Sequence, residues 1–103
     1  MKNKEAFVYI LSNKNHTVIY VGVTSDLGKR VLQHKAGFFN NSFTGKYNVT
    51  ELVYYELFQN IGDAIRREKQ LKAGSRENKI RLIIGFNPDW KNLTIKSKYQ
   101  NLY

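Results

Sequence analysis

Residues 61–73 read IGDAIRREKQLKA, a stretch with the periodicity of an amphipathic helix. Glu68 falls on the apolar side of this helix, three residues after Ile65 and three before Leu71. A charged carboxylate that faces inward needs a compensating charge, so Glu68 must pair with an arginine or bind a metal ion. The spacing alone leaves both alternatives open. The predicted inward stripe comprises Ile61, Ala64, Ile65, Glu68, Leu71 and, at one edge, Lys72.

Composition restricts the class of protein. The 103 residues include no cysteine, which excludes a disulfide framework and a thiolate metal site. Seventeen Lys+Arg residues against eight Asp+Glu give a net charge of +9, which predicts a polyanionic partner, most often nucleic acid. No apolar run approaches the roughly 20 residues of a membrane span, so we expect a cytoplasmic protein without membrane contact. We predict one domain over residues 1–90 and a basic C-terminal tail over residues 91–103.

Two segments near the N-terminus predict a β-hairpin. Residues 6–12 (AFVYILS) and 18–23 (VIYVGV) are rich in β-branched and aromatic residues, and an Asn-rich turn separates them. Alternation places Tyr9 on one face of the first strand and Tyr20 with Gly22 on one face of the second. Because a glycine inside a strand usually marks a close approach by another group, we expect open space beside Tyr20.

The remaining segments predict the order β-β-α-β-α-α. A helix capped within residues 24–26 should run to about residue 35, with Leu27, Val31 and Leu32 buried and Arg30 beside His34 on one face. Residues 36–49 predict a long loop whose phenylalanines either bind a ligand or cover the core. A strand at 50–57, a helix capped by Gly62 or Asp63 and a helix at 76–84 follow. This is an α/β protein of the α+β type, with helices covering a small three-stranded sheet.

Common site motifs are absent from the sequence. It contains no P-loop, GxGxxG, HExxH or GxSxG motif, and its two histidines cannot form a multi-histidine metal site. The remaining polar set suits phosphodiester cleavage, which needs an activated water, a phosphate-binding cation and help for the departing oxygen. Its members are Tyr9, Tyr20, Arg30, His34 and Glu68.

The spacing of these residues resembles a known family. Phe7-Val8-Tyr9, followed by Tyr20-Val21-Gly22, is similar to the paired motif that names the GIY-YIG nuclease superfamily. The match covers about residues 6–90 and is similar in particular to small stand-alone bacterial members related to the nuclease domain of the excision-repair incision subunit. Further residues follow in the family's order: Arg30, His34, Glu68 within REKQLK and Asn87 within FNPDW.

The resemblance implies an endonuclease with a three-stranded antiparallel sheet and both tyrosines at a shallow cleft. Its substrate would be DNA, cut with low sequence specificity in repair or processing; RNA is not excluded, and both a monomer and a homodimer remain open. Glu68 would bind one Mg²⁺ or Mn²⁺ ion, and Arg30 would contact the scissile phosphate. Tyr9 would act as general base, assisted by Tyr20 and His34, with Gly22 and Asn87 in supporting roles.

Two residues depart from the family's pattern. Phe7 stands where the motif has glycine, and Val23 stands where the repair subunits carry a lysine. Because a nearby lysine would lower a tyrosine pKa, we expect His34, Arg30 and the metal to do so here. We expect DNA to be bound through its phosphates by Lys29, Arg66, Lys69, Lys72, Arg76 and Lys79.

Two other functions remain open from the sequence. The chain could be a catalytically weak or inactive nucleic-acid-binding module on the same scaffold. It could also be an adaptor whose basic face binds an acidic protein.

Overall fold

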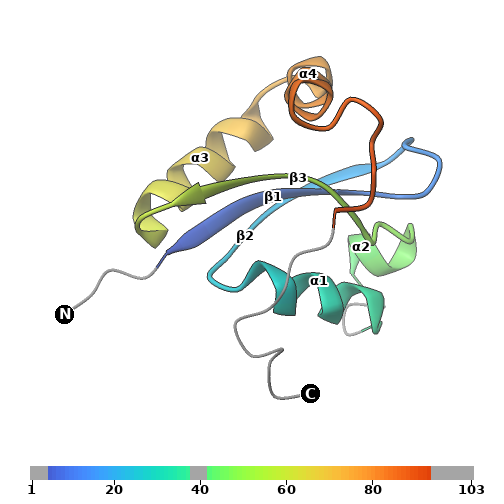
Figure 1. The fold of residues 1–103 in the computed structure, drawn as a ribbon, viewed down its shortest axis with the longest axis horizontal. Coiled ribbons are helices and arrows are strands. Elements are labelled where there is room, and N and C mark those ends of the chain that lie inside the picture. The colour runs from blue at the N-terminus through green and yellow to red at the C-terminus, as the bar shows by residue number, and fades with distance from the viewer. Residues whose placement is uncertain (1–4, 38–41, 94–103) are drawn as a thin grey trace.

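A three-stranded antiparallel sheet with helices on both sides forms the protein (Figure 1). The computed structural model describes residues 5–37 and 42–93. The predicted fold class and element order are confirmed, and the sheet order is β2-β1-β3. Phe38, Phe39 and the predicted tail from residue 94 onward lie outside the described residues. The elements are β1 (Ala6–Ser12), β2 (Ile19–Thr24), α1 (Leu27–Lys35), α2 (Phe43–Lys46), β3 (Glu51–Phe58), α3 (Ile61–Ala73) and α4 (Arg76–Phe86).

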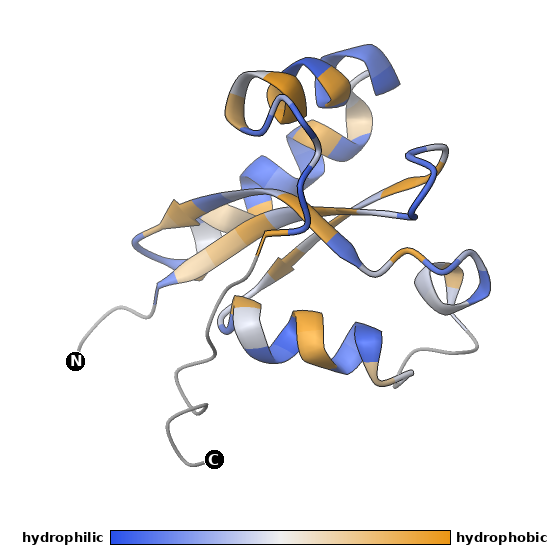
Figure 2. Ribbon diagram, turned by 45° about the vertical axis from the view of Figure 1, so that its right-hand side comes forward, coloured by the Kyte–Doolittle hydropathy of each residue, from blue (hydrophilic) through white to orange (hydrophobic). Residues whose placement is uncertain are grey.

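The central strand β1 is buried on both faces. Val8 and Ile10 belong to the core beneath α3 and α4, whereas Tyr9 and Leu11 belong to the core beneath α1. This division follows the alternation of the strand sequence. In Figure 1, α3 and α4 lie on one side of the sheet and α1 lies on the other. Figure 2 shows hydrophobic residues along the strands and mixed colouring on the helices, as expected when each helix buries one side.

The strand register brings the residues of the two motif tripeptides together. Tyr9 lies opposite Gly22 of β2 on one side and opposite Tyr55 of β3 on the other. A bulge between Ile10 and Leu11 shifts the pairing with β3. Tyr9 is therefore held at the centre of the sheet, one strand away from Tyr20.

Several local predictions were wrong. The N-cap of α3 is Asn60, not Gly62 or Asp63, because the Asn60 side chain accepts a hydrogen bond from the Asp63 backbone N–H at 2.9 Å. Ile61 and Ile65 are exposed, because α3 turns Ala64 and Leu71 towards the sheet.

Two predictions near α1 also fail. Leu32 is exposed, whereas Leu27, Val31 and His34 provide the buried side of that helix. The predicted loop at 36–49 contains a short helix, α2. It is capped by Ser42, whose hydroxyl accepts a hydrogen bond from the Gly45 N–H at 3.4 Å.

The last described residues are fastened to β3. The Asn87 side-chain amide donates hydrogen bonds to the Val53 carbonyl at 3.1 Å and to the Lys91 carbonyl at 2.8 Å. The Leu93 N–H donates to the Leu52 carbonyl at 2.8 Å. Asn87 thus holds the chain after α4 against the sheet through structural contacts, and its supporting role in the site stays a prediction.

Candidate functional site

Three rings from three different elements converge on one side of the sheet. The centroid of the Tyr9 ring in β1 lies 6.4 Å from that of Tyr20 in β2 and 6.4 Å from that of His34 in α1. The Tyr20 and His34 centroids are 6.1 Å apart. The hairpin register and the buried side of α1 therefore bring together three predicted site residues.

Tyr9 is buried and fills the space above Gly22. A Cβ atom added to Gly22 would lie 2.4 Å from both Cζ and Oη of Tyr9. The open space expected beside Tyr20 is therefore occupied by the Tyr9 ring. Glycine at this position is a steric requirement of the neighbouring strand.

Burial is also the main influence on the pKa of the Tyr9 hydroxyl. Removal from water disfavours the phenolate and raises the pKa of Tyr9 to about 12, with Tyr20 and Glu68 adding to the rise and Arg30 opposing it. Among the described residues, the hydroxyl has no hydrogen-bond partner of ordinary geometry. Arg30 and Glu68 are nevertheless both close enough to act on it through their charges.

His34 is held in place by α2. Its Nδ1 atom shares a 2.9 Å hydrogen bond with the Thr44 hydroxyl, and both side chains are buried. Burial and the charge of Arg30 lower the pKa of His34 to about 4, so the imidazole is neutral near pH 7. We expected His34 and Arg30 to lower a tyrosine pKa; for Tyr9, Arg30 acts in that direction, whereas a neutral His34 carries no charge that could do so.

Glu68 pairs with a lysine of its own helix. Its Oε2 atom lies 3.1 Å from Lys72 Nζ, and its side chain is only 16% exposed. Lys72 Nζ also lies 5.7 Å from the centroid of the Tyr20 ring. This lysine is neither of the two partners that the helix spacing left open, an arginine or a metal ion.

The donors present suit a hydrated divalent ion. No cluster of three or more His, Asp or Glu side chains occurs within residues 5–37 and 42–93. Mg²⁺ is often bound by one or two carboxylates, with water and substrate phosphate completing its shell. One partly exposed carboxylate at Glu68 is compatible with that mode of binding.

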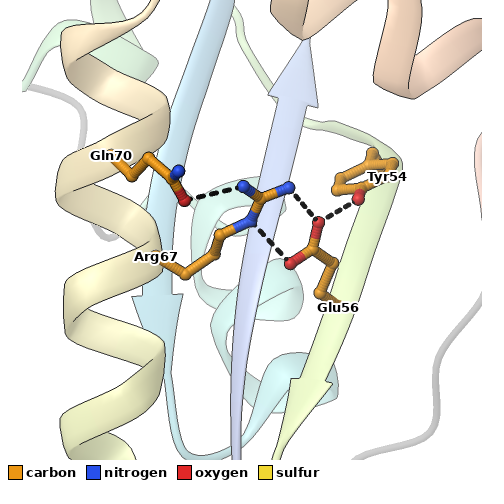
Figure 3. Close-up of polar contacts among 4 residues, drawn as sticks. All are labelled: Tyr54, Glu56, Arg67 and Gln70. Carbon is orange, nitrogen blue, oxygen red and sulfur yellow. Dashed lines mark hydrogen bonds and ion pairs between the residues drawn. The ribbon is translucent and has the colours of Figure 1, made fainter.

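An ion-pair network that the sequence did not predict orients α3 (Figure 3). Arg67 donates to both carboxylate oxygens of Glu56 at 2.9 Å, and its third bond goes to Gln70 at 2.8 Å. The Tyr54 hydroxyl donates to the same carboxylate. Burial alone would raise the pKa of Glu56, but these bonds outweigh it and lower the pKa. Arg67 thus ties α3 to β3, and the next residue on the helix is Glu68.

Two hollows meet at the Tyr20 ring. We call one the arginine hollow; it has a volume of about 220 Å³ and is lined by Tyr20, Arg30, His34, Ser42, Phe43 and Thr44. We call the other the basic hollow; it has a volume of about 360 Å³ and is lined by Ile19, Tyr20, Val21, Phe43, Lys72, Arg76 and Lys79. The stacked rings of Tyr20 and Phe43, 6.4 Å apart, form their shared wall.

The six basic residues predicted to bind DNA do not all gather in one place. Lys72, Arg76 and Lys79 line the basic hollow. Lys29 and Lys69 are exposed and line neither hollow, and Arg66 pairs with Asp63 on the outer side of α3. Phe43 is the lining residue whose role the sequence leaves undecided, and its place beside Tyr20 depends on the tertiary anchoring of α2.

Comparison with known proteins shows the family. The model of the GIY-YIG catalytic domain matches residues 5–81, and the chain belongs to this family. It is 33% identical over 81 residues to a UPF0213 protein of Staphylococcus saprophyticus, covering 75% of this chain and 92% of that protein. It is 38% identical over 77 residues to a UPF0213 protein of Natronomonas pharaonis, covering 75% and 88%.

A solved structure agrees with this assignment. The solution NMR structure of a UPF0213 protein from Bacillus halodurans matches with a TM-score of 0.54 and 28% identity, covering 85% of this chain and 92% of that one. The chain is thus similar to the small UPF0213 proteins of the GIY-YIG family, and its nuclease domain indicates a nucleic acid as substrate. GIY-YIG nucleases generally depend on a divalent metal. In the described part of the chain, no helix has the length and apolar character needed to span a membrane.

Proposed function

We propose that this protein is a metal-dependent endonuclease that hydrolyses phosphodiester bonds in DNA. The observation that supports this most directly is the convergence of the Tyr9, Tyr20 and His34 rings, with Arg30 and His34 lining one hollow. Glu68 acts on the Tyr9 hydroxyl through its charge, so an acidic group also lies near this cluster. Family membership supplies the reaction class.

The scissile phosphate binds in the arginine hollow in this proposal. The planar, forked guanidinium of Arg30 suits two phosphate oxygens and stabilises the charge that builds on them during cleavage. His34 stays neutral and is held by Thr44, so it shapes the hollow and positions the Tyr9 and Tyr20 rings. It does not compete with Arg30 as a second cation.

In its phenolate form, Tyr9 takes the proton of the attacking water on its oxygen. Its pKa is about 12 even with the opposing charge of Arg30, so the phenolate is a minor form near neutral pH. Glu68 would hold a Mg²⁺ or Mn²⁺ ion, which supplies positive charge for the departing oxygen when bound. When no metal ion is bound, Lys72 balances the charge of Glu68.

In this proposal, contacts with phosphate groups account for the affinity of the protein for DNA. Lys72, Arg76 and Lys79 line the basic hollow next to the arginine hollow, where they can bind phosphates flanking the cleaved bond. Such contacts carry no base information, so low sequence specificity is expected. That property suits an enzyme of DNA repair or processing.

A catalytically weak binding module is the second candidate. Two observations favour it: Tyr9 is buried with a pKa of about 12, and Val23 stands where the related repair subunits carry a lysine. The module would keep the phosphate contacts of the basic hollow and lack turnover.

Supercoiled plasmid separates the two candidates. Wild-type protein should nick it with Mg²⁺ or Mn²⁺ and not with chelator, and Arg30→Ala should lose at least about 100-fold in rate, as is typical when a group that stabilises transition-state charge is removed. Lys14→Ala, which removes a cation that lines neither hollow, is the control. Equal nicking by Arg30→Ala would rule out the arginine hollow, and plasmid binding without nicking by wild type would favour the binding module.

A further inference from the structure

The helix α2 and its C-cap residue Tyr47 present aromatic rings to solvent instead of burying them. The Phe43 and Tyr47 side chains are 49% and 44% exposed, and their ring centroids are 5.0 Å apart. Thr44, between them in sequence, is buried against His34. Val49 is also buried, and its N–H donates to the Thr44 carbonyl at 2.8 Å.

The residues that anchor this segment are different from the residues whose side chains it exposes to solvent. Thr44 and Val49 fix the segment, so Phe43 is not required as its anchor and does not serve mainly to cover the core. Half-exposed rings on a well-anchored segment are typical of a contact surface. We call Tyr20, Phe43 and Tyr47 together the aromatic platform.

The aromatic platform lies between Arg30 and the three cations of the basic hollow. Tyr20 and Phe43 form the wall shared by the arginine hollow and the basic hollow. Lys46 Nζ lies 5.6 Å from the Tyr47 ring centroid, so a further cation sits at the outer end of the platform. Rings alternating with cations are the means by which proteins bind single-stranded nucleic acid, since bases stack on the rings and phosphates contact the cations.

We propose that the aromatic platform stacks an unpaired nucleobase next to the phosphate held in the arginine hollow. A base within a continuous duplex is covered on both faces by its neighbours, so it must be unpaired or flipped out before its face can meet a protein ring. This inference rests on the proposed function and names its substrate class: a nucleic acid with an unpaired nucleotide at the cleavage position. Phosphates next to that nucleotide would contact the basic hollow.

Binding measured in chelator tests this inference without cleavage. Fluorescence anisotropy would compare a labelled single strand of about 12 nucleotides, within the range one single-strand-binding site covers, with its own duplex at one salt concentration. Phe43→Ala should weaken single-strand binding about tenfold, the scale of one base stack, and leave duplex binding unchanged. Phe43→Trp should retain the affinity, and Phe43→Leu should not, because leucine is apolar but cannot stack. Leu57→Ala, which removes a side chain that is 50% exposed and lines neither hollow, is the control.

A fluorescent base gives a direct signature. 2-Aminopurine in the single strand should be quenched on binding to wild type and not on binding to Phe43→Ala. The proposal is overturned if Phe43→Leu binds like wild type, or if Phe43→Ala weakens duplex and single strand equally. Tyr47→Ala repeats the test should Phe43→Ala fail to fold. Because no metal is present, failure of the cleavage assay leaves this result intact, and failure here leaves the nuclease assignment intact.

Discussion

The Tyr9 ring lies directly over Gly22, in the space that the side chain of any other residue at position 22 would occupy. The two residues are paired in the β1–β2 register, and a Cβ atom at position 22 would come within 2.4 Å of the phenol. The second tripeptide of the motif therefore contributes more than Tyr20, since its glycine allows the ring from the first tripeptide to reach the site. The two halves of the motif are sterically complementary.

Replacing Gly22 with alanine should displace Tyr9 and abolish cleavage. Overpacking of this kind typically lowers the free energy of unfolding by about 1–3 kcal/mol, which urea unfolding would measure. Gly85→Ala is a matched control, because an added Cβ there meets no atom within 4 Å. It lies inside α4 and should leave stability equal or raise it by up to about 1 kcal/mol. Full activity and stability in Gly22→Ala would contradict the steric account.

Stability should fall on mild acidification because His34 resists protonation. Its pKa is about 4 in the folded protein and near 6.5 in the unfolded chain. The unfolded state therefore binds more protons between these values, and stability is lost as pH falls from 6.5 towards 4. Between pH 7 and pH 5 wild type should lose on the order of 2 kcal/mol from this group. Urea unfolding should show a smaller loss for His34→Gln, and an identical pH dependence would refute the assignment.

The pairing of Arg67 with Glu56 should be important for both stability and metal binding. Removing one partner of this partly buried pair in Arg67→Met should lower the free energy of unfolding by about 2 kcal/mol. Arg67→Lys should not restore it, because lysine cannot make two parallel bonds to one carboxylate.

The same substitution should weaken Mn²⁺ binding, measured by calorimetry, because α3 also carries Glu68. Glu77→Gln is the control, as its pair with Arg81 is solvent-exposed at 4.0 Å and should contribute less than about 0.5 kcal/mol. Unchanged Mn²⁺ affinity in stable Arg67→Met protein would show that the network does not orient Glu68.

The basic hollow should set the salt dependence of DNA binding. Removing one side chain that binds a phosphate lowers the slope of log K against log salt by about 0.7 for single strands and 0.9 for duplex. Arg76→Gln and Lys79→Gln, which line the basic hollow, should each show that reduction in anisotropy titrations. Lys29→Gln, from outside both hollows, should not. Equal slopes for all three variants would place the phosphates elsewhere.

The sequence predicted the site best where a residue's place depends on local periodicity. Tyr9 and Tyr20 lie on strands whose alternation is clear, and the spacing of Arg30 and His34 puts them on one side of α1. The rotation of α3 was predicted less well, because a charge-rich helix has a weak apolar pattern. It depends on the contact of Arg67 with Glu56 across the sheet, which no local spacing reveals.

Phe43 shows the same limit in a different way. The predicted loop held phenylalanines that suited either the core or a binding surface. Which of the two roles Phe43 takes depends on the hydrogen bond between Thr44 and His34. This bond joins α2 to α1, and the sequence pattern does not predict it. Only the folded structure shows that Thr44 is buried and holds α2 in place, whereas the Phe43 side chain is exposed to solvent.

In the proposed function, Glu68 serves cleavage by holding a metal ion and is not only a partner of Lys72. The most direct test follows binding and cutting of one labelled DNA strand by wild type and Glu68→Gln, with Mn²⁺ present. We predict that wild type binds and cuts, whereas Glu68→Gln binds at least as tightly and cuts more than about 100-fold more slowly. Cutting by Glu68→Gln at the wild-type rate would contradict the account.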